Sequence, residues 1–150
     1  MRFLPLLLLA IPAPAFAQGT CGGMPAPGAA KLTVMLNEVR SAKGDIVVTV
    51  YPDNRSRFLR KGTKFARVRV RATPGTTSVC FWLTPGFYPI AVYHDENGDH
   101  DFNRTLIAPK EGFGFSNDPP TTFGIPGFDK VRTRVAPGEP RLQIRMRYPR

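Results

Sequence analysis

The chain has 150 residues, of which 42% are hydrophobic and 21% charged, and its formal net charge is +10. This length and apolar content suffice for one compact core and are too small for two domains of ordinary size. The 14 glycines and 16 prolines are one residue in five and follow no three-residue repeat, which excludes collagen and disfavours long helices. The composition therefore predicts a single domain of strands joined by turns.

The first 17 residues have the pattern of a secretory signal peptide. Arg2 precedes a short apolar run, and Ala15 and Ala17 occupy the −3 and −1 positions of a cleavage site. A membrane anchor would need about 20 apolar residues, whereas prolines interrupt this shorter run. We expect cleavage near Ala17 and a mature protein that is periplasmic or secreted, with no transmembrane segment.

Two cysteines, Cys21 and Cys80, follow the predicted cleavage site. An oxidising compartment would let them form a disulfide, and exported chains seldom keep two free thiols. The alternative is a buried Cys80 that packs as a small hydrophobic residue and a free Cys21 on a mobile segment. Residues 18–30 are small and turn-rich, so the sequence predicts a flexible leader there and a domain over residues 31–150.

Seven apolar segments of strand length follow at short spacing. Residues 65–72 and 142–148 alternate apolar side chains with arginines, which is typical of strands with one buried and one solvated face. Seven short strands favour an all-β fold, a single β-sandwich. The predicted strands span residues 32–39, 46–51, 65–72, 77–83, 87–94, 131–135 and 142–148.

The connections carry their own signals. Residues 41–45 and 73–75 have turn composition and predict two hairpins. Pro89 cannot donate a backbone hydrogen bond, so its strand is expected to lie at an edge or to contain a bulge. The basic residues 53–63 could form one short helical turn. Residues 95–128 show no clear strand or helix, and a loop of this length is usually functional, so we expect its five phenylalanines to cover one end of the sandwich.

The long loop begins with oxygen-bearing side chains at every second position. Ca²⁺ binds six to eight oxygens, and a tight loop supplies them from alternating positions, so we predict a Ca²⁺ site that Glu111 closes. The segment is not a standard EF-hand, because the sixth position is His100 and the twelfth is Leu106. The alternative is an Asx-rich turn that satisfies its own backbone and binds no ion. The predicted ligands are Asp95, Asn97, Asp99, Asp101, Asn103 and Glu111.

Other chemistry has weaker support. His94 and His100 lack cysteine partners and make a poor zinc site. His94, Asp95 and Ser116 are residue types used in nucleophilic catalysis, but no nucleophile elbow, phosphate-binding loop or dinucleotide motif accompanies them. We therefore predict a protein without enzymatic activity.

Arginines line one face of three predicted strands. If these strands share a sheet, the arginines would form a basic surface for an anionic glycan or lipid. The alternative is a solvated face that keeps strands from pairing with other molecules. Nucleic acid is disfavoured by export and because no aromatic side chains interleave the arginines. The predicted ligand-binding residues are Phe113, Phe115, Arg67, Arg69 and Arg145.

Residues 83–118 resemble an exported bacterial family described as domain of unknown function 2141. The chain matches its pattern in LTPGFY, HDENG and PKEGFGFSN. The matching positions are Tyr88, His94, Asp95, Asn97, Gly98, Pro109, Glu111, Gly112, Gly114, Phe115, Ser116 and Asn117. The resemblance covers residues 32–148 and implies an immunoglobulin-like or transthyretin-like β-sandwich with no assigned activity.

Together these features predict an exported, non-enzymatic β-sandwich with a Ca²⁺-stabilised loop, acting as a binding or interaction module of the cell envelope. Its expected partners are an envelope protein or an anionic glycan or lipid surface. The alternative is a carbohydrate-binding module that uses Phe113, Phe115 and the nearby arginines.

Overall fold

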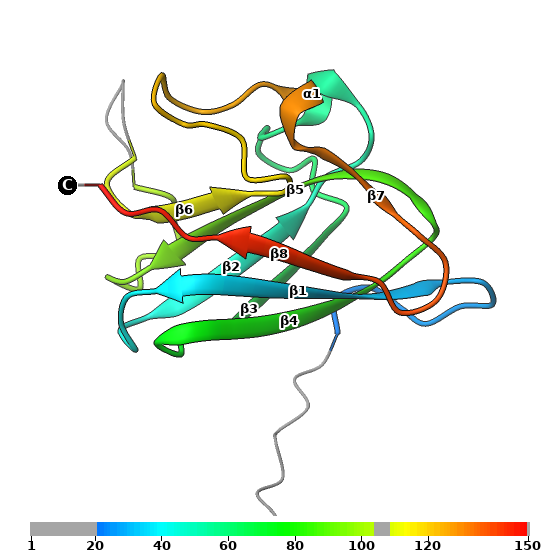
Figure 1. Ribbon diagram of the computed structural model, residues 1–150, viewed down its shortest axis with the longest axis horizontal. Helices are drawn as coiled ribbons and strands as arrows, with labels where there is room; N and C mark the ends of the chain where they lie inside the picture. Colours follow the sequence, from blue (N-terminus) through cyan, green and yellow to red (C-terminus); the bar gives the residue numbers. More distant parts are fainter. Residues whose placement is uncertain (1–20, 104–108, 150) are drawn as a thin grey trace, which may run out of the picture.

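A computed structural model describes residues 21–103 and 109–149, and within them the chain is almost entirely β (Figure 1). A 3₁₀ turn, η1, spans Arg55–Arg57 in the basic connection, and the helix α1 spans Phe128–Val131. The predicted signal peptide lies outside the described residues. The strands are β1 (Ala30–Val39), β2 (Asp45–Val50), β3 (Ala66–Arg71), β4 (Gly75–Leu83), β5 (Gly86–Asp95), β6 (Gly112–Phe115), β7 (Arg132–Val135) and β8 (Arg141–Arg145).

The strands form two sheets that share one core. The first sheet has the order β4-β1-β8, and the second has the order β3-β2-β5-β6, with β7 paired to one end of β5. Strands β1 and β8 are parallel, and the other strand pairs are antiparallel. In Figure 1 the first sheet lies in front of the second. The all-β architecture and all seven predicted strands are confirmed, whereas the immunoglobulin-like or transthyretin-like class stays a prediction.

Alternation along each strand explains the core. In β1, Leu32, Val34 and Leu36 are buried while the intervening side chains are partly exposed. The second sheet contributes Val48 and Val92 to the same cluster. Each alternating strand therefore buries one face against the other sheet.

Both predicted hairpins are wrong. Residues 41–45 connect β1 of the first sheet to β2 of the second, and residues 73–75 return the chain from β3 to β4. Turn residues permit a reversal, but they do not determine whether the flanking strands pair or cross between sheets. Gly44 is required in the first crossing, because its φ is +64° and a Cβ there would lie 1.8 Å from the carbonyl oxygen of Asp95.

The expectation that Pro89 marks an edge strand is also wrong. Strand β5 is central: it pairs with β2 over Ile90 to Asp95 and with β6 from Ala91. Pro89 is the last β5 residue paired with β7. The proline is tolerated because it lies where β5 exchanges one partner for the next.

The long loop contains a strand that the sequence did not predict. Strand β6 is only four residues long, and Gly112 and Gly114 alternate with Phe113 and Phe115. The glycines allow close packing, since a Cβ at Gly114 would lie 2.7 Å from the Arg145 carbonyl oxygen. Four residues with two glycines give too weak an apolar alternation to be recognised as a strand.

The predicted disulfide is present and joins Cys21 to Cys80, with their Cα atoms 4.6 Å apart. Gly22 also pairs with β4, since its N–H donates to the Cys80 carbonyl at 2.9 Å and its carbonyl accepts from Trp82 at 2.8 Å. The described part of the predicted leader is therefore held on the first sheet rather than flexible. No helix in residues 21–103 and 109–149 is long and apolar enough to cross a membrane.

Candidate functional site

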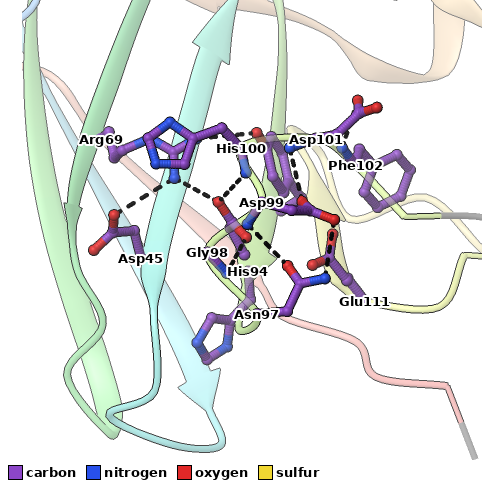
Figure 2. A network of polar contacts seen from close by, with 12 residues as sticks. Asp45, Arg69, His94, Asn97, Gly98, Asp99, His100, Asp101, Phe102 and Glu111 are labelled. Atoms are coloured by element: carbon purple, nitrogen blue, oxygen red, sulfur yellow. Dashed lines mark hydrogen bonds and ion pairs between the residues drawn. The ribbon is translucent and has the colours of Figure 1, made fainter.

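The candidate site begins at Asp95, the last residue of β5. Its side chain is on the face of the second sheet that points away from the main core, and it is fully buried. One carboxylate oxygen accepts from Arg69 Nη1 at 2.7 Å and from the His100 N–H at 3.1 Å. The other accepts from the Gly98 N–H at 2.8 Å (Figure 2). Asp95 thus fastens the start of the loop to the sheet, and Arg69 balances its charge.

Asp99 is the centre of a series of Asx turns over residues 97–103. Its carboxylate accepts from the Asn103 amide at 2.7 Å, the Asn97 amide at 2.9 Å and the Asp101 N–H at 2.9 Å. These three hydrogen bonds, led by the one from Asn103, lower the pKa of the Asp99 carboxyl. Asp99 is therefore ionised at neutral pH although it lies beside other acids.

Glu111, which directly precedes β6, is the least satisfied member of the group. It is 6% exposed; its Oε2 accepts from the Asn103 N–H at 3.0 Å, and its Oε1 has no hydrogen-bond partner among the described residues. Burial raises the pKa of Glu111; hydrogen bonds from Asn103 oppose the rise, and the charges of Asp95 and Asp99 add to it. This side chain is buried, close to other carboxylates and only half paired.

The three acids converge on one point. One carboxylate oxygen from each of Asp95, Asp99 and Glu111 lies within 4.8 Å of the other two. Figure 2 shows Asn97 and Glu111 beside Asp99, although they come from different segments of the loop. We call Asp95, Asp99 and Glu111 the acidic cluster.

The remaining predicted ligands are placed differently. The amides of Asn97 and Asn103 donate to Asp99, and the Asn97 oxygen also accepts from the Asp99 N–H at 3.2 Å. Each amide oxygen has two lone pairs, so it could also serve an ion. The group of converging carboxylates does not include Asp101, whose exposed side chain accepts from the Phe102 N–H at 3.0 Å. Asp101 lies apart from the three carboxylates because alternation keeps side chains on one side only in a straight strand, and this segment turns at Gly98 and His100, where φ is +72° and +66°. Its role as a ligand stays a prediction.

The histidines do not belong to the acidic cluster. His94 is fully buried, and its Nε2 lies 2.7 Å from the Lys43 carbonyl oxygen, so this nitrogen is the donor. Its Nδ1 lies 2.8 Å from the Tyr148 hydroxyl and accepts from it. Both ring nitrogens therefore connect parts of the fold and are unavailable to a metal or a substrate.

The family comparison matches a model described as "Uncharacterized protein conserved in bacteria (DUF2141)" over residues 34–143. The chain belongs to this family. Searches of curated proteins and of solved structures gave no match to the chain. The expected resemblance is confirmed, and because the family is uncharacterised, the function of this member has to be argued from its own geometry.

In this DUF2141 member the predicted basic surface is not continuous. Arg67 and Arg69 are on β3 of the second sheet, whereas Arg145 is on β8 of the first sheet and pairs with Glu38 at 3.0 Å. Arg69 is turned toward Asp95 and Asp45. The prediction required these strands to share one sheet, whereas β3 is in the second sheet and β8 is in the first.

Phe113 and Phe115 are also placed differently from the prediction. They are 8% and 4% exposed and pack in a second cluster with Val131 on the outer face of the second sheet. Rings buried to this extent cannot offer their faces to a sugar, so they do not form an exposed stacking platform. The role of Arg69 as partner of Asp95 was not found from the sequence, because β2 lies between their strands and no local pattern relates them.

Proposed function

We propose that this protein is a non-enzymatic binding module of the bacterial cell envelope, and that Ca²⁺ bound at the acidic cluster stabilises its loop. One observation carries the ion proposal: Glu111 is buried, and one of its carboxylate oxygens is unpaired next to two further carboxylates. An unpaired buried oxygen of an ionised group destabilises a fold unless a cation or a proton compensates it.

The donor chemistry supports Ca²⁺ over a transition metal. The cluster presents carboxylate oxygens, with amide oxygens available from Asn97 and Asn103. Hard cations prefer such oxygens, whereas zinc sites are built from cysteine and histidine. The fully buried His94 has both nitrogens bonded elsewhere, so it is not available as a ligand.

An ion at this point would act on the loop rather than on the core. Asp95 ends β5, Asp99 is within the Asx turns and Glu111 precedes β6, so one ion would join three separate segments. It would also relieve the repulsion among the three carboxylates. The expected effect is an ordered connection between β5 and β6 of the second sheet.

Two side-chain arrangements support a role without catalysis. The Ser116 hydroxyl is fully buried, accepts from the Ile90 N–H at 3.0 Å and donates to the Val131 carbonyl. His94 is bonded to Tyr148 and Lys43. The serine and the histidine that could have formed a nucleophile and its base are thus each used to hold backbone and neighbouring strands together.

Melting curves in EDTA, Ca²⁺ and Mg²⁺ test the ion proposal. At a free ion concentration a hundredfold above Kd, binding stabilises the fold by about 2.7 kcal/mol, or about 10 °C in Tm for a domain of this size. Mg²⁺ should do less because it demands a compact octahedron of ligands. Glu111→Gln should abolish the Ca²⁺ shift.

The matched control is Glu96→Gln. Glu96 is the neighbour of Asp95 but pairs with Arg40 and Ser41, so its loss should leave the Ca²⁺ shift intact. Superimposable wild-type curves in EDTA and Ca²⁺ would mean that the loop is an Asx-rich turn that binds no Ca²⁺.

A further inference from the structure

The outer face of the second sheet contains a cavity of about 710 Å³. Its floor is built from side chains that strand register places in two adjacent rows. One row includes Thr49 and Ala91, and the other includes Tyr93 and Phe113. Residues 59–64 and residues 100–102 form walls of the cavity. This volume is within the range of small-molecule sites and corresponds to one ligand of moderate size.

The lining of the cavity is apolar at its floor and at part of its rim. Phe113 and Phe115 are nearly buried and line the floor. Leu59 and Ile125 line the same cavity and are each 37% exposed. Exposed apolar side chains around a concave apolar floor indicate a surface that a hydrophobic body would cover.

The same cavity is strongly basic. Its lining includes Arg60, Lys61, Lys64 and Arg67, and the one acid in the lining is Asp101. None of the four cations forms an ion pair with a carboxylate of the described residues. Six other arginines do form such pairs: Arg40, Arg55, Arg69, Arg71, Arg132 and Arg145. Positive charge without a carboxylate partner is thus gathered around this apolar floor.

Arg67 connects the basic rim to the floor. Its Nε donates to the Thr49 hydroxyl at 2.9 Å, which fixes the guanidinium over β2. The two residues are also opposite each other in the β2–β3 register, so the sheet itself sets this position. A fixed guanidinium is well suited to bind a carboxylate, sulfonate or phosphate through two parallel hydrogen bonds.

We infer that this cavity binds a small organic anion whose hydrophobic ring body lies on the aromatic floor and whose acidic group is held by Arg67 and the neighbouring lysines. A neutral sugar fits the lining less well, because it has no acidic group for the four cations of the lining. This inference deepens the proposal that the chain is a binding module, and it does not rest on the calcium site.

Two fluorescent dyes provide a direct test, because they differ in their acidic group. 8-Anilino-1-naphthalenesulfonate has two aromatic ring systems and a sulfonate, and N-phenyl-1-naphthylamine is the same framework without it. The sulfonate dye should bind the folded protein with one-to-one stoichiometry and at least about tenfold more tightly than the neutral dye. Its affinity should fall as salt is raised, since ions screen the exposed charges.

Variants locate the site. Arg67→Gln, and separately the double variant Lys61→Gln/Lys64→Gln, should each weaken the sulfonate dye by about fivefold or more and leave the neutral dye unchanged. The matched control is Arg141→Gln, which removes the same charge from β8 of the first sheet. Unchanged melting temperatures of the variants show that the dye reports on the cavity rather than on unfolding.

Several outcomes would overturn the inference. These are equal affinity for the two dyes, a stoichiometry well above one, or an equal loss of affinity in Arg141→Gln and Arg67→Gln. Tight binding of digalacturonate with no binding of either dye would mean that the ligand is an acidic sugar rather than a hydrophobic anion. Repeating the titration in EDTA and in Ca²⁺ separates the two proposals, because dye binding in EDTA supports the cavity even if no Ca²⁺ shift is found.

Discussion

Removal of the Cys21–Cys80 disulfide should destabilise the fold more than any single surface substitution. The two cysteines are 59 residues apart in the sequence. In the loop-entropy treatment, a cross-link of this span lowers the entropy of the unfolded chain by about 14 cal/mol/K, or about 4 kcal/mol at 25 °C. For roughly 130 folded residues the entropy of unfolding is about 0.27 kcal/mol/K, so this loss corresponds to about 15 °C in Tm.

The structure adds a local contribution to this loss of stability. The disulfide holds Gly22 against β4, where the glycine makes two backbone hydrogen bonds with Cys80 and Trp82. A Cβ at Gly22 would lie 2.7 Å from the Phe81 ring, so the glycine also fits closely over the core side of the strand. Without the cross-link this short segment has little else to hold it, and its pairing should be lost.

The assay is thermal and urea unfolding of Cys21→Ala/Cys80→Ala beside the wild type, each with and without dithiothreitol. Reduced wild type should unfold at nearly the same midpoint as the double variant, and the reductant should not affect the double variant. A loss of stability below about 1 kcal/mol would refute the reasoning, because it would mean that the unfolded chain is constrained between these positions by something other than the disulfide.

Three further predictions concern the site, the sheet crossing and the leader. The folded-state pKa of Glu111 is raised, so its contribution to stability is present below the ordinary carboxyl pKa and is lost as pH rises through the raised value. In EDTA, Glu111→Gln should therefore gain stability over wild type with rising pH, as measured by urea unfolding. Gly44→Ala should cost more than about 3 kcal/mol because its Cβ meets the Asp95 backbone, whereas Gly138→Ala, at φ +90° in open space, should cost about 1–2 kcal/mol. Intact mass of protein recovered from the periplasm should lack residues 1–17, and a retained Met1 would contradict the predicted cleavage near Ala17.

The two-residue alternation of apolar side chains explains why most of the strands could be predicted, and its absence explains why β6 could not. In β3 the arginines alternate with Val68 and Val70, and this two-residue period alone locates a strand with one buried face. In β6 half of the positions are glycine, so the burial of all four residues is set by neighbours such as Tyr148 and Ile144 rather than by a local pattern. A strand that depends on distant contacts has no sequence pattern of its own from which it could be predicted.

The topology depends on pairings that no local pattern contains. Residues 41–45 and 73–75 reverse the chain as predicted, yet each connects the two sheets. The parallel pairing of β1 with β8 joins segments more than 100 residues apart. These choices separate Arg145 from Arg67 and Arg69, which is why the basic surface expected from the sequence does not form.

Residue type located the acidic cluster, but its balance of charge could not be read from the sequence. Asp95, Asp99 and Glu111 are recognisable because oxygen ligands recur in a short loop. The two buried acids differ in their hydrogen bonds: Asp95 accepts from three donors including Arg69, whereas Glu111 has one unpaired oxygen. That difference depends on how β3, β5 and β6 are arranged around the loop.

The acidic cluster and the cavity belong to one layer of side chains on the outer face of the second sheet. Arg69 bonds to Asp95 at 2.7 Å and to the Tyr93 hydroxyl at 3.3 Å, and the Tyr93 ring contacts Phe102 with centroids 5.5 Å apart. Tyr93 and Phe102 both line the cavity, so the loop held by Asp95 is also a cavity wall. An ion that orders the loop would therefore shape the ligand site, and by linkage a ligand that needs this wall would strengthen ion binding by the same factor. A loop, rather than another sheet, covers this outer face, and this leaves room for a ligand between the aromatic floor and the basic rim.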